Sequence, residues 1–172
     1  MAKRTPLGAS GKGQRGISTL GWALRGAAAG AAGSTALNAV TYLDMAVRGR
    51  GTSSTPEDTA ERLAGKAHLP IPGDGETRQN RVQGLGPLMG LVAGVGVGTI
   101  GGLARARGHL SAKPVGIVLT TVGVMVAANG PMTALGVTDP RTWSVEDWIS
   151  DIVPHLAYGV VATFTIDAFD RP

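Results

Sequence analysis

The sequence predicts an all-α integral membrane protein: a four-helix bundle with a glycine zipper in its second span and a short amphipathic helix in its first loop. Residues 85–104 carry no charge over 20 positions, which is the length a helix needs to cross a hydrocarbon core of about 30 Å. Charged residues make up 16% of the chain, against about 25% in soluble domains, and 27 of its 172 residues are glycine. This composition favours a polytopic membrane protein over a soluble domain.

The second span, about residues 85–106, has a small residue at every fourth position. At 3.6 residues per turn, this spacing aligns the glycines along one side of a helix. In water each glycine would cost a helix about 1 kcal/mol relative to alanine, whereas in a bilayer a stripe without side chains lets another helix approach closely. We therefore predict a packing stripe made of Gly86, Gly90, Gly94, Gly98 and Gly102.

The first span, about residues 18–47, carries a matching face. Gly26, Gly30 and Ser34 also step by four positions. Two faces of small residues pack with their backbones close together. The first helix is therefore the expected partner of the glycine stripe within the same chain, and this weakens the case for dimerisation through the stripe.

The polar loop between these spans, residues 48–84, is expected to lie on the membrane surface, with docking of a partner as the alternative. Thr55 is a suitable N-cap, Pro56 suits the first helical position, and acidic residues follow in the first turn. These signals predict an amphipathic helix over about 56–67. Residues 76–83 are expected to form a helical lead-in to the second span.

The remaining spans are expected over about 115–137 and 149–169. Pro131, in an Asn-Gly-Pro run, predicts a kink or break near the end of the third span, because proline cannot donate its backbone hydrogen bond. Trp143 and Trp148 precede the fourth span and suit the headgroup interface.

Residues 1–15 form a basic tail without acidic residues, which is expected to be disordered, and residues 16–172 form one transmembrane domain. Four spans place both termini on one side of the cell membrane. The tail and the loop at 105–113 are short and dense in cations, so we expect both termini to be cytoplasmic. These cations flank apolar runs, and an anionic lipid surface, rather than nucleic acid, is their expected partner.

Polar residues at membrane depth are the candidates for chemistry. Asp151, His155 and Tyr158 share one helix face, where a carboxylate can orient an imidazole that titrates near neutral pH. This face can act as a proton relay or serve only structural and interfacial roles. Asn38 and Asn129 lie nearer the middle of their spans, and they either hydrogen-bond across helices or line a polar cavity.

Other site classes find no support. The chain has no cysteine, and its three histidines lie in separate segments, so neither a metal site nor another cofactor is expected. Residues 96–101 match the Gly-x-Gly-x-x-Gly pattern, but no acidic residue occurs between Leu103 and Thr138 to bind a ribose. Helix packing explains these glycines better than dinucleotide binding.

The fourth span also carries a resemblance. From Trp148 to Leu156 it reads Trp-Ile-Ser-Asp-Ile-Val-Pro-His-Leu, and Asp167 follows near the end of the helix. This run resembles the final helix of the small YagU-type inner-membrane proteins, and the Gly/Ala-rich four-span layout resembles uncharacterised small membrane proteins of actinobacteria. Pro154, the glycine stripe and the long first loop depart from the YagU-type pattern. The resemblance implies a membrane location and an acid–histidine pair, Asp151 and His155, but no particular reaction.

Two function classes follow. The first is a non-enzymatic membrane protein that acts by helix packing, with a second copy of itself or another membrane protein as its partner beside the lipid bilayer. The second is a small transporter or proton-responsive channel that uses the polar residues of the first, third and fourth spans. An enzyme is not expected, because the sequence offers no arrangement of nucleophile and base.

Overall fold

The computed structural model describes residues 17–110 and 113–170, so the predicted basic tail lies outside the described residues. Helices joined by loops make up the described residues, and none of these residues forms a strand. The helices in chain order are α1 (Thr19–Arg48), α2 (Thr55–Lys66), α3 (Gly75–Ala106), α4 (Lys113–Ala134), the short 3₁₀ helix η1 (Pro140–Thr142) and α5 (Val145–Asp170).

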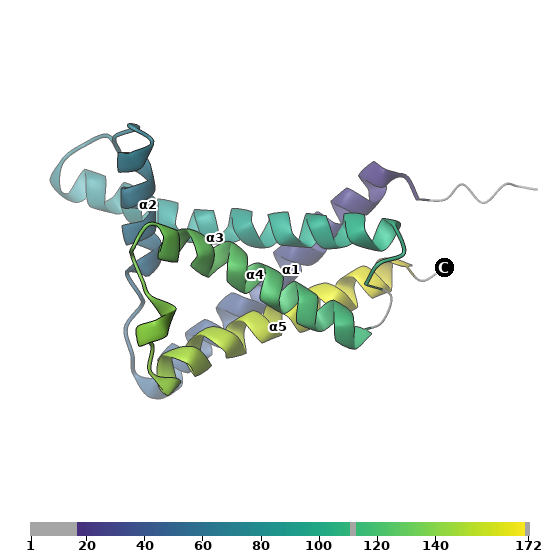
Figure 1. The fold of residues 1–172 in the computed structure, drawn as a ribbon. Helices are drawn as coiled ribbons and strands as arrows, with labels where there is room; N and C mark the ends of the chain where they lie inside the picture. The colour runs from purple at the N-terminus through teal and green to yellow at the C-terminus, as the bar shows by residue number, and fades with distance from the viewer. Residues whose placement is uncertain (1–16, 111–112, 171–172) are drawn as a thin grey trace, which may run out of the picture.

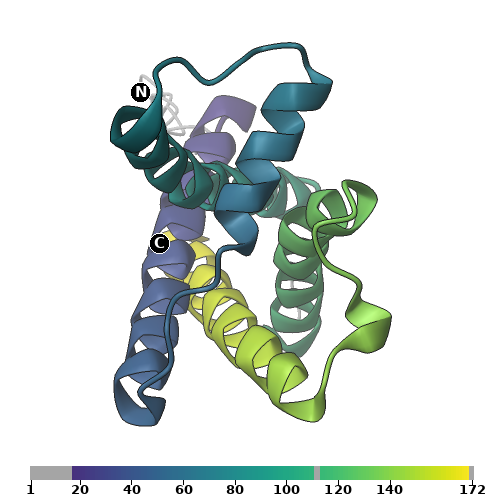
Figure 2. The same ribbon diagram turned by 90° about the vertical axis from the view of Figure 1, so that its left-hand side faces the viewer.

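The four long helices lie side by side and run alternately in opposite directions (Figures 1 and 2). α1 packs against α3 and α5, α4 packs against α5, and α2 lies across one end of the bundle against α3. We call this the α2 end. The opposite end, the turn end, holds the start of α1, the α3–α4 turn and the end of α5.

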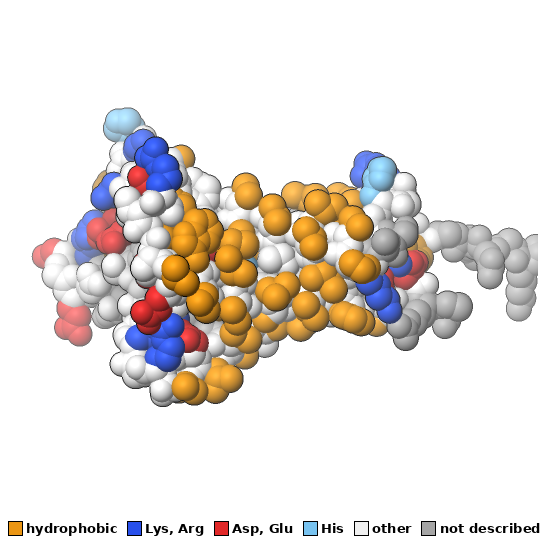
Figure 3. All heavy atoms as spheres, turned by 60° about the horizontal axis from the view of Figure 1, so that its bottom comes forward, with side chains coloured by type: hydrophobic (Ala, Val, Ile, Leu, Met, Phe, Trp, Pro, Cys, Tyr) orange, Lys and Arg blue, Asp and Glu red, His pale blue; other side chains and the backbone are white. Residues whose placement is uncertain are grey.

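Three described helices, α3, α4 and α5, are long and apolar enough to cross a membrane, with mean hydropathy of 1.6, 1.6 and 1.4 in their most apolar windows. Exposed apolar side chains cover the middle of the bundle, and charged side chains gather at its two ends (Figure 3). Leu88 of α3, Val118 of α4 and Phe164 of α5 are each about half exposed. A lipid environment accounts for this pattern, because large exposed apolar surfaces are costly in water.

α1 does not belong to this set of three. It is long enough, at 30 residues, but its many Gly, Ala, Ser and Thr residues, together with Asn38, lower its hydropathy below that of the other three. By composition the structure therefore supports the predicted spans that α3, α4 and α5 form, and the span that α1 would form stays a prediction.

Backbone contact between α1 and α3 takes place at glycines. A Cβ atom added to Gly30 would lie 2.6 Å from the carbonyl oxygen of Gly94, and one added to Gly102 would lie 2.8 Å from the Cα atom of Gly26. A Cβ on Gly98 would collide with the backbone of Gly26 and Gly30. Any larger residue at these positions would force the two helices apart.

The other two glycines of the predicted stripe lie outside this contact. Gly86 packs against α2, where an added Cβ would lie 3.0 Å from the backbone nitrogen of Glu57. Gly90 has no neighbour within 4 Å of an added Cβ. The four-residue spacing drifts slowly around a helix of 3.6 residues per turn, so one partner helix does not cover the whole stripe.

The start of α2 differs in detail from the prediction. Thr55 is the first helical residue and Ser54 occupies the N-cap, so the assignment of Thr55 as N-cap is wrong. The Ser54 hydroxyl donates to Asp58 instead of accepting a bond from the helix backbone. Residues 76–83 are helical as predicted, and they form one continuous helix with the second span.

Of the kink or break predicted at Pro131, the break is wrong, because α4 continues through this residue to Ala134. Pro131 lies in the last turn of the helix, so only a few helical residues follow the hydrogen bond that it cannot make. The end itself is closed by Gly136 in the left-handed conformation, with the backbone N–H of Val137 donating to the carbonyl of Met132. Arg62 of α2 donates to the carbonyl oxygens of Leu135 and Gly136 and so ties α2 to this terminus.

Candidate functional site

A polar cluster joins α4 to α5 near the α2 end. The Asn129 side-chain amide donates to the Asp151 carboxylate at 3.0 Å. His155 lies one turn further along α5, with its Nδ1 atom 3.4 Å from Asp151 Oδ1 and 2.6 Å from the Asp151 carbonyl oxygen. The side chains of Asp151 and His155 are only 15% and 11% exposed. The structure thus brings together Asn129, Asp151 and His155 of the candidate residues.

The geometry of His155 fixes the position of its proton. A carbonyl oxygen only accepts hydrogen bonds, so Nδ1, which faces the Asp151 carbonyl, carries the hydrogen in the neutral ring. Nε2 is then the acceptor nitrogen of the ring, and the Asp151 carboxylate lies beside Nδ1.

Tyr158 serves the packing of three helices and lies outside this cluster. Its hydroxyl donates to the carbonyl oxygen of Gly94 on α3 at 2.5 Å. Its ring fills the space beside Gly33 of α1, where an added Cβ would lie 2.7 Å from a ring carbon. Val124 of α4 and Ala162 belong to the same buried cluster as Tyr158.

Asn38 also lies outside the cluster. It is exposed on α1, and its side chain makes no hydrogen bond to the residues that the structure describes. Its spacing from Gly26, Gly30 and Ser34 placed it on the small-residue face, but at its position α1 has moved away from α3. The cluster is therefore built from α4 and α5 alone.

Charged residues tie α1 to α5 beside this cluster. Arg48 reaches Glu146 at 2.7 Å and donates to the Ser150 hydroxyl, directly before Asp151. Asp44 pairs with Arg48 at 3.5 Å and with Arg50 at 2.5 Å. These contacts pair Asp44 and Arg48 of α1 within a network of opposite charges at the α2 end.

The loop between α4 and α5 is ordered by its own side chains. The Trp143 and Trp148 rings pack edge to face with centroids 4.9 Å apart, and the Trp143 indole donates to Thr138. Side-chain hydrogen bonds from Arg141 lower the pKa of Asp139 below its ordinary value. Both tryptophans lie at the α2 end, a position that suits the headgroup region.

A second polar cluster, which the sequence did not predict, lies at the turn end. Arg105 of α3 reaches Asp167 at 3.0 Å and Asp170 at 2.8 Å, and it also donates to the carbonyl oxygen of Leu110. The side chains of Arg105 and Asp167 are largely buried. The signal for this cluster was available, because Asp167 continues the four-residue spacing that begins with Asp151 and His155.

Two described cavities differ in size and place. One of about 220 Å³ lies at the α2 end, outside the apolar part of the bundle, and is lined by Ser54, Glu57, Asp58, Gln79 and Gln83 among others. The second lies between α3, α4 and α5 and holds about 10 Å³, room for roughly one water molecule. Among residues 17–110 and 113–170, no group of acidic or histidine side chains is arranged to hold a metal ion.

Comparison of the chain with protein-family models, with curated proteins and with solved structures finds no match. The likeness of the last helix to the YagU-type proteins therefore stays a prediction, and the function has to be inferred from the geometry.

We predict that Asn129→Leu lowers the thermal unfolding midpoint of the detergent-solubilised protein by about 2–6 °C, because it removes a hydrogen bond between helices worth about 0.6–2 kcal/mol. Asn38→Leu is the matched control, since Asn38 is exposed and makes no such bond, and its midpoint should stay within about 2 °C of the wild type. Equal shifts for the two variants would show that the Asn129–Asp151 bond does not hold α4 to α5.

Proposed function

We propose that the chain is a four-span, non-enzymatic protein of the cell membrane that acts through helix packing, as an accessory component or as a homo-oligomer. The observation that carries this proposal is the closed interior of the bundle. Glycine contacts bring α1 and α3 together, and the described cavity inside the apolar region has room for only about one water molecule. The cavity described between α3, α4 and α5 is too small for an organic substrate, while the outer surface of the bundle is apolar and suits contact with lipid or another helix.

The position of α1 supports its assignment as a membrane span beside α3, α4 and α5. α1 runs beside α3 and α5 from the turn end to the α2 end (Figure 1). Its uncharged part lies between Arg25 and Asp44 and covers residues 26–43, which is about 27 Å of helix. If α3 and α5 cross the hydrocarbon core, α1 passes through the same layer. Close packing with those helices then compensates for its lower hydropathy.

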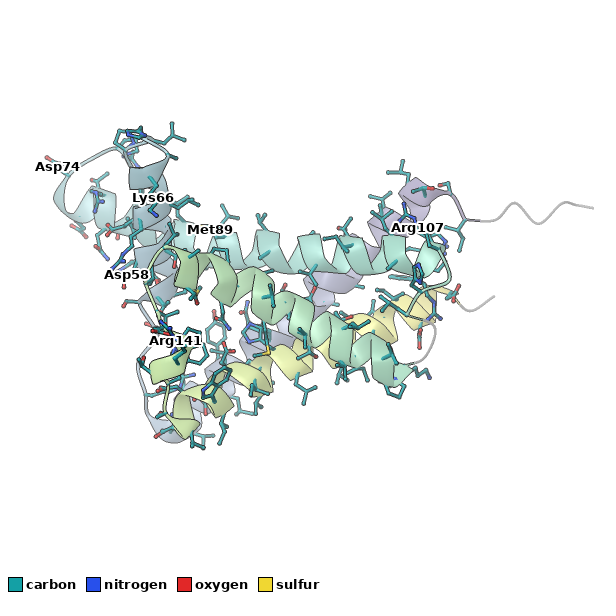
Figure 4. The ribbon with its side chains drawn as sticks, in the orientation of Figure 1. Asp58, Lys66, Asp74, Met89, Arg107 and Arg141 are labelled. Carbon is teal, nitrogen blue, oxygen red and sulfur yellow. The ribbon has the colours of Figure 1, made fainter. Side chains whose placement is uncertain are left out.

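The distribution of charge supports an orientation with the turn end in the cytoplasm. Figure 4 labels Asp58, Asp74 and Arg141 at the α2 end and Arg107 at the turn end. The acidic residues of the α2 end are Asp44, Glu57, Asp58, Glu61, Asp74, Glu76, Asp139, Glu146, Asp147 and Asp151, and Asp167 and Asp170 complete the 12 of the chain. The short segment around the turn between α3 and α4 carries Arg105, Arg107 and Lys113 without an acidic residue, and a short basic segment of this kind favours the cytoplasmic side.

The cluster of Asn129, Asp151 and His155 supports a second candidate, a proton-responsive channel or small transporter. It places a titratable imidazole beside a carboxylate near one membrane boundary. The small size of the cavity inside the bundle favours a proton over any larger solute.

Thiol labelling tests the four-span topology, because the chain contains no cysteine of its own. We expect Arg107→Cys and Lys12→Cys to be shielded from a membrane-impermeant maleimide in intact cells, and Lys66→Cys to be labelled. Permeabilised cells should label all three variants. If Lys12→Cys and Arg107→Cys are labelled from opposite sides of the membrane, α1 does not cross it. If all three variants show the reverse labelling pattern, the proposed orientation is wrong.

Chemical crosslinking in membranes tests assembly. We expect defined species larger than the 17.4 kDa monomer, either multiples of this chain or a complex with another membrane protein. Dilution with protein-free lipid is the control, because a specific complex persists on dilution whereas chance encounters decline. Detection of the monomer alone would contradict a function based on helix packing.

A further inference from the structure

α5 has a polar residue or a glycine at every fourth position along most of its length. These positions are Asp151, His155, Gly159, Thr163 and Asp167. His155, Gly159, Thr163 and Asp167 are buried. Each step of four residues turns about 40° beyond a full turn, so neighbouring positions share a face while the row winds slowly around α5. It begins at Asp151, beside Asn129 of α4, and ends at Asp167, beside Arg105 of α3. The 16 residue steps from first to last extend about 24 Å, most of the thickness of a hydrocarbon core.

The gap at Gly159 is filled from α4 by a hydroxyl group. A Cβ atom on Gly159 would collide with the Thr121 Oγ1 atom and lie 2.9 Å from the carbonyl oxygen of Ile117. Gly116 of α4 in turn makes room for Thr163, because a Cβ atom added to Gly116 would lie 3.0 Å from the Thr163 Cγ2 atom. The sequence of groups along α5 is thus carboxylate, imidazole, hydroxyl, hydroxyl, carboxylate. We call Asp151, His155, Thr121, Thr163 and Asp167 the α5 polar row.

The two hydroxyl groups in this row have no hydrogen-bond partner among the described residues. Thr121 and Thr163 are only 8% and 5% exposed, and the Oγ1 atom of each is unpaired. Other threonines of the long helices behave differently: Thr41, Thr99 and Thr165 each donate to the backbone carbonyl four residues earlier. Buried hydroxyl groups without a protein partner are places where ordered water binds.

One described cavity beside the row has room for water. The cavity of about 10 Å³ lies beside Thr163 and is also lined by Thr120, Asp167 and Arg105, so it has room for one such water.

We propose that the α5 polar row conducts protons across the membrane. This inference deepens the second candidate function and names the proton as the species carried. At each step one N–H or O–H bond forms and another breaks: His155 accepts a proton at one ring nitrogen and releases one from the other, and each water or hydroxyl accepts at its oxygen and passes on a hydrogen. The protein therefore returns to its starting charge without any oxidant or reductant.

The charged groups around the row are consistent with entry and exit at its two ends. On α1, Asp44 and Arg48 pair with Arg50 and Glu146 near the Asp151 end, and Asn129 is the polar group on α4 at that end. On α3, Arg105 faces the other end, where it shares its charge between Asp167 and Asp170. The middle of the row contains only the neutral hydroxyl groups of Thr121 and Thr163. Passage of a proton therefore depends on the bound water molecules.

The test uses the full chain reconstituted in liposomes that contain a pH-sensitive dye. After an external acid jump, with valinomycin and potassium to prevent charge build-up, we expect faster internal acidification than in protein-free liposomes. The double variant Thr121→Val and Thr163→Val keeps the side-chain shape but should slow the protein-dependent rate by at least about tenfold, because it removes the groups that hold the water. Thr165→Val is the matched control and should keep the wild-type rate within about twofold, since its hydroxyl bonds to its own helix.

Proton flux no faster than in protein-free liposomes, or an unchanged rate in the double variant, would overturn the proposal. Unfolding midpoints of the variants identify any rate lost through misfolding. The double variant Thr121→Ser and Thr163→Ser keeps both hydroxyl groups and removes only two methyl groups, so it should retain most of the wild-type flux. Thiol labelling in the same liposomes separates the two levels of inference. Four crossings without proton flux refute only the α5 polar row, whereas labelling that contradicts the crossings refutes the proposed membrane topology itself.

Discussion

Close contact between the backbones of α1 and α3 is the constraint on which the rest of the bundle depends. A Cβ atom added to Gly26, Gly30, Gly98 or Gly102 would collide with the backbone of the facing helix, whereas at Gly94 it would meet the Ser34 side chain. This approach brings Gly33 of α1 and the carbonyl of Gly94 within reach of one side chain of α5, Tyr158. A single tyrosine can therefore join three helices, with its ring packed on one and its hydroxyl bonded to another.

The position of Tyr158 in turn determines which face of α5 meets α4. With Tyr158 directed at α1 and α3, the neighbouring face presents Gly159 and Thr163 to α4. Asn129 meets Asp151 at one end of this contact, and Thr121 enters beside Gly159 further along. The same packing that closes the bundle thus collects its buried polar groups between two helices. Polar groups enclosed in an apolar layer are costly and commonly functional.

Much of the architecture follows from periodicity and composition, but the neighbours of each face do not. Uncharged runs located α3, α4 and α5, and capping residues located α2 to within one residue. A four-residue spacing indicates a helix face without indicating what covers it, so Gly86 meets α2, Gly90 meets nothing, and Asn38 lies outside the cluster. Thr121 and Thr163 gave no signal as single residues, because their burial depends on Gly159 and Gly116 of the facing helix.

The most direct test of this account is a disulfide between α1 and α3 within one chain. A Cβ atom at Gly94 would lie 3.6 Å from the Cβ atom of Ser34, a separation typical of disulfides. In this cysteine-free chain, the pair Ser34→Cys and Gly94→Cys should form an intramolecular crosslink on mild oxidation, visible by mass spectrometry of the digested monomer. The pair Ser34→Cys and Gly90→Cys, with Gly90 in open space, should not. Equal crosslinking of the two pairs, or crosslinking only between separate chains, would contradict the contact between α1 and α3.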